Sequence, residues 1–261
     1  MVAGVGEGDA ETDPAAGWNR WYSNMAGHRA PRDNLVQRHL GLPPQLRSTS
    51  LLTWDAIADV VDALRLRPGD RLLDLACGRG GYGLEIARRT HAHVHGVDIS
   101  AEAIRQATEN AQHSEVAAEF TVGTFTATGR PTASVDAIVA VDAIQFASEA
   151  ESFEEMRRVL VAGGRVVLTT WEALDRSDER VSERLRHTDT FARLTEAGFA
   201  DIRVVERPEW RTAERRMWED AVAIDPDGDP DLQDLHDEAT SILPMLDLTR
   251  RVQATATAPT T

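Results

Sequence analysis

The feature that most constrains the fold is a short apolar run that contains an acid and then passes through glycines. It occupies residues 72–83 and reads Leu-Leu-Asp-Leu-Ala-Cys-Gly-Arg-Gly-Gly-Tyr-Gly. Gly78 and Gly80 permit a positive φ and a close approach of the backbone to a ligand. A helix that begins here offers free N–H groups. The pattern therefore predicts a buried strand, a tight turn and a helix N-terminus that together hold a small molecule.

Strands and helices alternate on both sides of this turn. Apolar runs predict strands at 71–76, 94–97, 118–122, 135–141, 165–169 and 201–205, with helices at 82–89, 101–112, 152–160 and 190–197. Such short apolar runs are typical of a parallel sheet that is covered on both faces. We therefore expect an α/β, doubly wound domain with its ligand at the carboxyl ends of the strands. A final run at 250–256 predicts an edge strand.

The chain divides into a flexible tail at 1–17, an N-terminal helical cap at 18–66 and the alternating domain at 67–261, with a helical lid insertion at about 207–248. In the cap, Trp18, Trp21 and Tyr22 share one helix face. Ser50 is expected to cap a second helix. The insertion is much longer than a hairpin loop requires, so we expect it to wall the substrate site.

The acid of the first strand discriminates between two nucleotide ligands. Read literally, the glycines of the turn and Asp98 match a dinucleotide fingerprint, in which Asp98 accepts ribose hydroxyls. Asp74 lies four residues before Gly78, where it would repel a pyrophosphate and attract an ammonium group. The ligand implied has a ribose, an amino-acid end and no phosphate, as S-adenosylmethionine does. An NAD(P)-dependent oxidoreductase is the alternative.

Four segments resemble the class I S-adenosylmethionine-dependent methyltransferases, in that family's order. They are Leu-Leu-Asp-x-x-Cys-Gly-x-Gly at 72–80, Gly-Val-Asp-Ile-Ser at 96–100, Val-Asp-Ala-Ile-Val-Ala-Val-Asp at 135–142 and Arg-Val-Leu-x-x-Gly-Gly-Arg-Val at 158–166. Within the family, the chain is most similar to bacterial small-molecule enzymes of secondary metabolism. The resemblance implies a Rossmann-like, mostly parallel seven-stranded sheet with an antiparallel last strand. It also implies methyl transfer to an O, N or C atom in natural-product biosynthesis, with S-adenosylhomocysteine as product.

The resemblance assigns residues to the methionine end of the cofactor. Asp74 would neighbour the methionine ammonium, and Val141 would offer its carbonyl to the same group. The loop beneath the methionine and ribose would comprise Ala76, Gly78 and Gly80. Ala76 stands where the family usually has Gly, and it is still small.

The resemblance also assigns residues to the adenosine end. Asp98 would accept the ribose hydroxyls, Ile99 would pack on one face of the adenine, and Phe125 would cover its edge. Thr124 stands where the family usually has an Asp that accepts from the adenine amino group. This departure leaves the residue that holds the amino group open.

Candidates for the acceptor side follow the strands and the flanking segments. We expect the substrate wall to comprise Trp21, Tyr22, Gln145, Phe146, Trp171, Met217 and Trp218. A general base is needed only where the acceptor must lose a proton, and the candidates are His28, Asp142, Glu172 and His187. The alternative for the residues of the substrate wall is that they belong to the core. Met217 and Trp218 would then hold the helix of the insertion against the sheet.

Three histidines and the single cysteine have simpler explanations than a metal site. His91, His93 and His95 alternate along one strand face, but at the end opposite the expected ligand site. We expect exposed strand histidines, with Cys77 as a packing residue of the turn. No metal is expected.

The charge balance limits the partners. With 28 basic and 43 acidic residues the formal net charge is −15, and every basic residue is Arg. A polyanion would be repelled, so we expect neither nucleic acid nor an acidic membrane surface as partner.

The composition and the lack of targeting segments indicate the biological setting. The arginine bias resembles a GC-rich, actinobacterial genome. Without a signal peptide or apolar span, we expect a cytoplasmic protein, monomeric or homodimeric, that binds a small-molecule acceptor. A non-catalytic cofactor-binding subunit is a further alternative.

Overall fold

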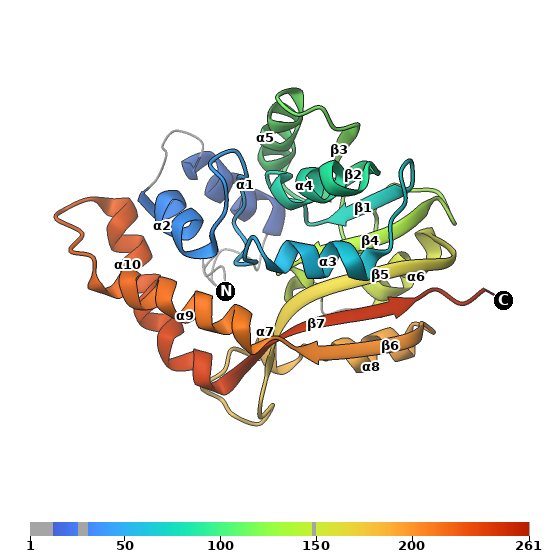
Figure 1. The fold of residues 1–261 in the computed structure, drawn as a ribbon. Helices are drawn as coiled ribbons and strands as arrows, with labels where there is room; N and C mark the ends of the chain where they lie inside the picture. Colours follow the sequence, from blue (N-terminus) through green and yellow to red (C-terminus); the bar gives the residue numbers. More distant parts are fainter. Residues whose placement is uncertain (1–12, 26–30, 148–149, 261) are drawn as a thin grey trace.

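The computed structural model describes residues 13–25, 31–147 and 150–260. A seven-stranded sheet in the order β3-β2-β1-β4-β5-β7-β6 runs through it (Figure 1). Its strands are β1 (Arg71–Leu75), β2 (His93–Asp98), β3 (Ala118–Val122), β4 (Val135–Val141), β5 (Leu160–Ala173), β6 (Ala200–Glu206) and β7 (Thr249–Thr257). β7 runs antiparallel to β5 and β6, whereas β1 to β5 pair in parallel. The predicted α/β, Rossmann-like sheet with an antiparallel last strand is confirmed.

Helices precede, connect and follow these strands. The helices are α1 (Pro14–Met25), α2 (Pro31–Leu40), α3 (Ala56–Leu64), α4 (Gly81–Thr90), α5 (Ala101–Gln112), α6 (Ala150–Val159), α7 (Glu183–Arg186), α8 (Thr190–Glu196), α9 (Pro208–Ala223) and α10 (Pro230–Ile242), with the short turns η1 (Ile144–Phe146) and η2 (Leu243–Leu248). Helix α1 begins at Pro14, inside the range that we expected to be tail.

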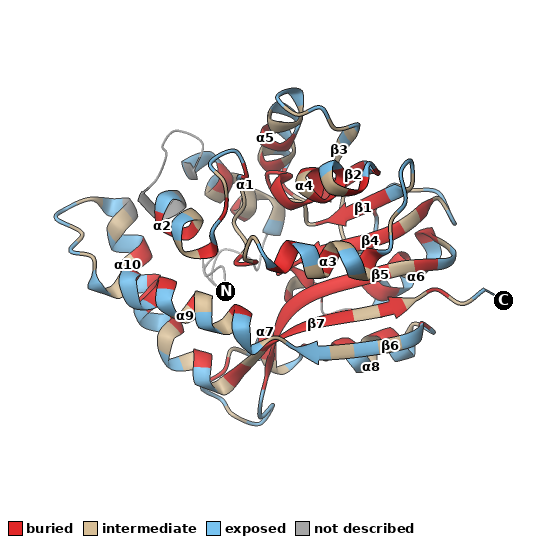
Figure 2. Ribbon diagram, viewed as in Figure 1, coloured by how far each residue is buried: buried red, intermediate tan, exposed pale blue. Residues whose placement is uncertain are grey.

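Each face of the sheet is buried under its own apolar cluster. Leu72 in β1 packs in the cluster that includes Ile57 of α3 and Ile86 of α4. Leu73, one residue along the strand, packs in the cluster that includes Met156 of α6. This alternation follows from the two-residue period of a strand. β4, β5 and β7 are buried on both faces, whereas β6 at the edge is mostly exposed (Figure 2).

The strand order reverses between β1 and β4, and this places the ligand crevice. From β1 the chain winds outward through β2 to β3, and from β4 it winds in the other direction to β5. Connections that diverge in this way leave a crevice at the carboxyl ends of the two central strands. The loops after Leu75 and Val141 therefore face one another across it.

Helices from both ends of the chain gather beside this crevice. Helix α2 packs against α9 and α10 (Figure 1). Across this contact, Nε2 of His39 lies 2.9 Å from Oδ2 of Asp220. Helix α1 packs instead against α5. Helix α2 and the insertion therefore pack together, while α1 packs on the α5 side of the sheet.

Two local expectations were wrong. The last strand is not an edge strand, because β7 lies between β5 and β6, and both its faces are buried. Ser50 caps no helix, because α3 begins only at Ala56. The Leu51 N–H donates instead to the side chain of Asp142, and the chain turns at residues 54–55 before α3 begins.

The three histidines do not share one strand face. His91 ends α4 in a left-handed conformation, and His93 is exposed at the start of β2. His95 is buried rather than exposed, with its ring nitrogens on Glu119 and Thr121. Within residues 13–25, 31–147 and 150–260, no three His, Cys, Asp or Glu side chains gather as metal ligands would. No helix in the same ranges has the length and apolarity that crossing a membrane requires.

Candidate functional site

A cavity of about 520 Å³ lies at the carboxyl ends of β1, β2 and β4. It is lined by Pro14, Trp18, Tyr22, Thr49, Ser50, Leu75, Ala76, Val97, Asp98, Ile99, Gly123, Thr124, Phe125, Val141, Asp142, Ala143, Gln145, Phe146, Glu183, Arg184 and His187. These residues come from α1, the loop before α3, four strand ends and α7. The crevice predicted from the strand pattern is therefore a real cavity, with one wall from the N-terminal helix.

The turn after β1 reaches the cavity through Ala76, whereas Gly78 and Gly80, which were expected under the cofactor, lie outside the cavity lining. Ala76, Gly78 and Gly80 all have positive φ, of 54°, 52° and 78°. A Cβ at Gly78 would lie 2.7 Å from the hydroxyl oxygen of Tyr22, so a larger residue here would have to displace the Tyr22 side chain and adopt a strained positive φ. Ala76 lines the cavity and adopts the left-handed conformation that disfavours residues other than glycine. This conformation explains why a glycine usually occupies its place.

Asp98 is a fixed hydrogen-bond acceptor on the cavity wall. One carboxylate oxygen accepts from the Gly78 N–H at 2.9 Å and the other from the Ser100 N–H at 2.9 Å. Burial raises the pKa of Asp98, and the N–H groups of Ser100, Gly78 and Ile99 act against that rise. Each carboxylate oxygen has two lone pairs, so the side chain retains capacity for further donors.

Asp74 does not line the cavity. Its carboxyl group is buried against the start of α4, where it accepts from the Gly83 N–H. Burial and, second, the charge of Asp98 raise the pKa of Asp74 to about 7. A ligand in the cavity therefore cannot place its ammonium group directly against Asp74 in this arrangement.

The far end of the cavity is lined by the loops after β2 and β3. Ile99, Gly123, Thr124 and Phe125 lie together there, as a planar base would require. The Thr124 hydroxyl lies 3.2 Å from that of Thr126, so it has a local partner. Three of the residues predicted for the adenosine end, Ile99, Thr124 and Phe125, thus share one region.

Aromatic side chains of α1 cover the cavity. The Trp18 ring meets Phe146 edge-on, with centroids 5.4 Å apart, and Tyr22 lies over the glycine turn. Burial, followed by the charge of Asp98, raises the pKa of Tyr22, so its hydroxyl stays protonated. Trp21 lies outside the lining and packs edge-on against Trp18 and Tyr22. Asn19 anchors the helix, because its Oδ1 accepts from the Ser100 hydroxyl and the Glu102 N–H.

The turn after β4 forms the opposite wall. The Val141 carbonyl, expected to face the cavity, accepts from the Ser50 hydroxyl at 3.0 Å. Gln145 and Phe146, which we expect to contact the substrate, both line the cavity. The Gln145 amide donates to the Asp142 carbonyl at 2.7 Å, and the guanidinium of Arg184 lies 4.4 Å from the Phe146 ring centre.

The candidate bases differ in whether they reach the cavity and in whether other groups already bond to them. Asp142 borders the cavity, but its carboxylate accepts from Leu51, Thr169 and Arg251 and is not poised to take a proton. His187 lines the cavity, while His28 lies outside the described residues.

Glu172 is a structural residue rather than a site residue. Its carboxylate is buried away from the cavity, where it accepts from the Thr190 N–H and hydroxyl and pairs with Arg250 at 2.8 Å. Its neighbour Trp171 on the other face of β5 lies outside the cavity lining as well.

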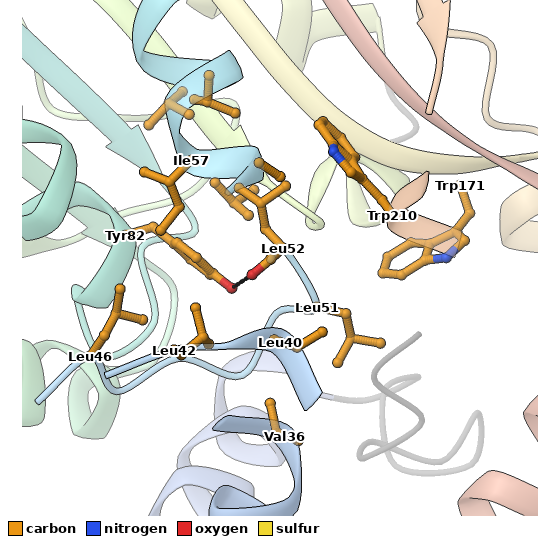
Figure 3. Packing of buried hydrophobic residues seen from close by; sticks show 14 of the residues in the cluster. Val36, Leu40, Leu42, Leu46, Leu51, Leu52, Ile57, Tyr82, Trp171 and Trp210 are labelled. Carbon is orange, nitrogen blue, oxygen red and sulfur yellow. Dashed lines mark hydrogen bonds between the residues drawn. The ribbon is translucent and has the colours of Figure 1, made fainter. Parts of the chain in front are cut away.

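The predicted substrate wall of Trp171, Met217 and Trp218 is core instead. All three are buried in the cluster beneath α9, and none lines the cavity. Figure 3 shows Trp171 and Trp210 packed near Leu51 and Leu52 in this cluster, where the Tyr82 hydroxyl donates to the Leu52 carbonyl at 2.7 Å. The indole N–H of Trp171 donates to Glu214 at 2.9 Å.

Sequence reasoning missed several cavity residues. Thr49 and Ser50 arrive from the loop before α3, and Glu183 and Arg184 arrive from α7. Both segments look like ordinary polar loops, so no local pattern marks them. The buried stripe of α9 had a usable signal, because Trp210, Glu214, Met217, Trp218 and Ala221 recur at helical spacing.

Comparison with known proteins identifies the family of this chain. A family model described as a methyltransferase domain matches residues 66–221. The phosphoethanolamine N-methyltransferase of Triticum aestivum is 29% identical over 162 residues, which cover 57% of this chain and 32% of the wheat enzyme. The chain therefore matches only about a third of that relative's length.

Solved structures share the fold at low identity. Phosphoethanolamine N-methyltransferase 2 of Haemonchus contortus, in complex with phosphomonomethylethanolamine and S-adenosylhomocysteine, has a TM-score of 0.73 at 18% identity, covering 92% of this chain and 60% of that one. The 4+2 cyclase SpnF has a TM-score of 0.71 at 19% identity, covering 95% and 97%. The chain therefore belongs to the methyltransferase-domain family and has the Rossmann-like fold of class I S-adenosylmethionine-dependent methyltransferases.

Proposed function

We propose that this protein transfers a methyl group from S-adenosylmethionine to a small molecule. The observation that carries the proposal is the buried Asp98 carboxylate, which two backbone N–H groups fix at the wall of a cavity at the switch point of the sheet. A carboxylate in this place suits the two hydroxyls of a ribose. Membership of the methyltransferase-domain family supports the same activity.

The cavity suits this cofactor better than a dinucleotide. A pyrophosphate would need the first N–H groups of α4. Asp74 is buried against that helix end, accepts from the Gly83 N–H, and would overlap a Cβ placed on Gly83. A carboxylate there disfavours phosphate. The neutral ribose and zwitterionic methionine of S-adenosylmethionine meet no such repulsion, which argues against the NAD(P)-dependent alternative.

The chain's own residues would bind and orient the cofactor. Asp98 would accept the ribose hydroxyls, Ile99 and Phe125 would flank the adenine, and Val141 would present its carbonyl to the ammonium group. The glycine turn would let the backbone approach closely. When bound, the sulfonium supplies the methyl group. The protein contributes alignment of the acceptor and exclusion of water, which the aromatic cover of α1 provides.

The acceptor would lie between α1, the turn after β4 and α7. Trp18 and Phe146 offer apolar surface there, and Glu183, Arg184 and His187 offer polar groups. Of the candidate bases on the described cavity wall, the His187 imidazole is the one that a proton could reach, since Asp142 is tied by three donors. An acceptor that is already ionised, or a neutral amine, needs no base.

Our finer proposal concerns the biological setting. We suggest a small-molecule acceptor of bacterial secondary metabolism, such as an antibiotic precursor, in an actinobacterial cytoplasm, and a monomer or homodimer that binds neither nucleic acid nor membrane. The arginine-only basic composition and the net charge of −15 support this setting.

A labelling experiment tests the proposal. The protein is incubated with S-adenosylmethionine that carries a deuterated methyl group, together with phosphoethanolamine, a phenol, a secondary amine or the small-molecule fraction of a bacterial culture extract. Mass spectrometry then follows S-adenosylhomocysteine and deuterated products. We expect product with at least one acceptor above the acceptor-free rate, and a lower rate with Asp98→Ala when S-adenosylmethionine is below saturation.

A second candidate function is a non-methylating one, because the 4+2 cyclase SpnF has a similar fold. A non-methylating protein of this fold would bind S-adenosylmethionine yet release no S-adenosylhomocysteine with any acceptor fraction. Tight binding without turnover would therefore contradict methyl transfer and favour the non-methylating alternative.

A further inference from the structure

A cluster of charged side chains lies buried beside the cavity, between β4, β7 and α9. The Arg251 guanidinium donates to Oδ1 of Asp142 at 2.7 Å and to Oε2 of Glu214 at 3.3 Å, and all three side chains have 0% exposure. The guanidinium carbon also lies 4.0 Å from the centre of the Trp171 ring. Asp142 lines the cavity, whereas Arg251 and Glu214 do not.

The cation of this cluster controls where the two carboxylates lie. Removing one partner of a buried ion pair leaves an uncompensated charge, which is strongly unfavourable. Asp142 and Glu214 would then repel one another across the space that Arg251 occupies. The planar guanidinium can bond two carboxylates at once, which a single ammonium group does less well. The position of Asp142 therefore depends on a residue more than a hundred positions away in sequence.

Asp142 in turn holds two parts of the cavity wall together. It has a φ of 56°, in the left-handed region. Its Oδ2 accepts from the Leu51 N–H at 2.9 Å, and the adjacent Val141 carbonyl accepts from the Ser50 hydroxyl at 3.0 Å. These two bonds join the loop before α3 to the end of β4. Ser50 and Val141 both line the cavity.

We infer that Arg251 is a positioning residue for cofactor binding, which acts through Asp142 on the wall formed by Ser50 and Val141. The inference rests on the proposed function, because it takes S-adenosylhomocysteine as the ligand of that wall. Arg251 itself touches neither the cavity nor a reacting atom. It sets the conformation of the turn after β4, and so links the C-terminal insertion, through Glu214, to the cofactor site.

The test measures S-adenosylhomocysteine affinity and hydrogen exchange in Arg251→Gln. We expect the dissociation constant to rise at least tenfold and amides in segments 49–52 and 141–146 to exchange faster. Arg251→Lys, which keeps the charge but bonds two carboxylates less well, should recover part of the affinity. The matched control is Arg250→Gln, the next residue of β7, whose buried partner Glu172 lies outside the cavity. It should leave the affinity within twofold.

Asp142→Asn keeps the test decisive if Arg251→Gln does not fold. Asn tolerates the left-handed backbone, so this variant removes the charge and one of the two acceptor oxygens without straining the main chain. The same loss of affinity is expected, without further loss in the double variant. If the folded variants bind S-adenosylhomocysteine as tightly as wild type, or Arg250→Gln weakens binding equally, the positioning role is wrong. If wild-type protein does not bind at all, the proposed function fails instead, and the exchange rates alone then decide whether Arg251 holds the turn.

Discussion

Asp98 owes its place on the cavity wall to backbone donors rather than to a charged partner. The N–H groups of Gly78 and Ser100 reach its two oxygens from opposite sides. The side chain is therefore oriented before any ligand arrives, and a ligand hydroxyl meets an acceptor that does not need to reorganise. The sequence spacing of Asp98 and the glycines predicted this proximity, because both lie at the ends of adjacent parallel strands.

Replacing Asp98 by Ala should weaken S-adenosylhomocysteine binding by about 1–3 kcal/mol, since two hydroxyls lose a charged acceptor. This corresponds to a rise of the dissociation constant of about five- to 150-fold. Calorimetric titration measures it. Glu172→Gln, a buried carboxylate away from the cavity, serves as control and should bind normally. An unchanged constant in Asp98→Ala would mean that the ribose is held elsewhere.

Asp74 should make stability fall as the pH rises. Burial raises its pKa in the folded chain to about 7, above the ordinary value of 3.8, so the folded state binds the proton more tightly than the unfolded state. Between these two values the free energy of unfolding should fall by up to about 1.4 kcal/mol per pH unit, and this contribution levels off above pH 7. Urea denaturation of wild type and Asp74→Asn between pH 5 and 8 measures the slope. In Asp74→Asn the free energy of unfolding should depend less on pH. Equal pH dependence in the two proteins would contradict the raised pKa of Asp74.

At the scale of elements, α9 holds the insertion against the sheet rather than walling the substrate. Its buried stripe places Trp210, Met217 and Trp218 in the main core cluster, and Glu214 beneath them receives the indole N–H of Trp171. The sequence showed the helical period of this stripe. It did not show which surface the stripe would cover, because that depends on strand β7 and helix α2.

Replacing Trp218 by Ala should destabilise the fold by about 3–5 kcal/mol, because a fully buried indole leaves a cavity and a lost hydrogen bond to Glu214. The folded fraction should still bind S-adenosylhomocysteine within threefold of wild type, since Trp218 does not line the cavity. Urea denaturation and ligand titration measure the two effects. Phe191→Ala, at a residue 55% exposed on α8, should change stability by less than about 0.5 kcal/mol. Weaker binding with unchanged stability in Trp218→Ala would restore the substrate-wall interpretation.

Local patterns predicted most elements, but not the residues that meet only through tertiary packing. The strands around Asp74, Asp98 and Val141 carry their own periodicity and turn residues, so their order follows from the sequence. Ser50 was assigned as a helix cap because it precedes an apolar period. Its actual partner is the Val141 carbonyl, 91 residues away. No local pattern reports such a contact.

At the scale of the whole molecule, one cavity joins segments that lie between Pro14 and His187 in sequence. Helix α1 supplies its cover, the two halves of the sheet supply its walls, and α7 supplies polar groups at one side. The buried Arg251 then ties the C-terminal insertion to the same wall. This arrangement follows from the reversal of strand order between β1 and β4, which places a crevice where all these segments meet.

Calorimetric titration of the wild-type protein with S-adenosylhomocysteine tests the central claim most directly. The cavity beside Asp98 and the glycine turn predicts one binding site per chain with a micromolar dissociation constant. It also predicts no change in nicotinamide fluorescence when NADH or NADPH is added. Absence of measurable S-adenosylhomocysteine binding by folded protein, above all together with a change in nicotinamide fluorescence, would contradict the assignment of this cavity.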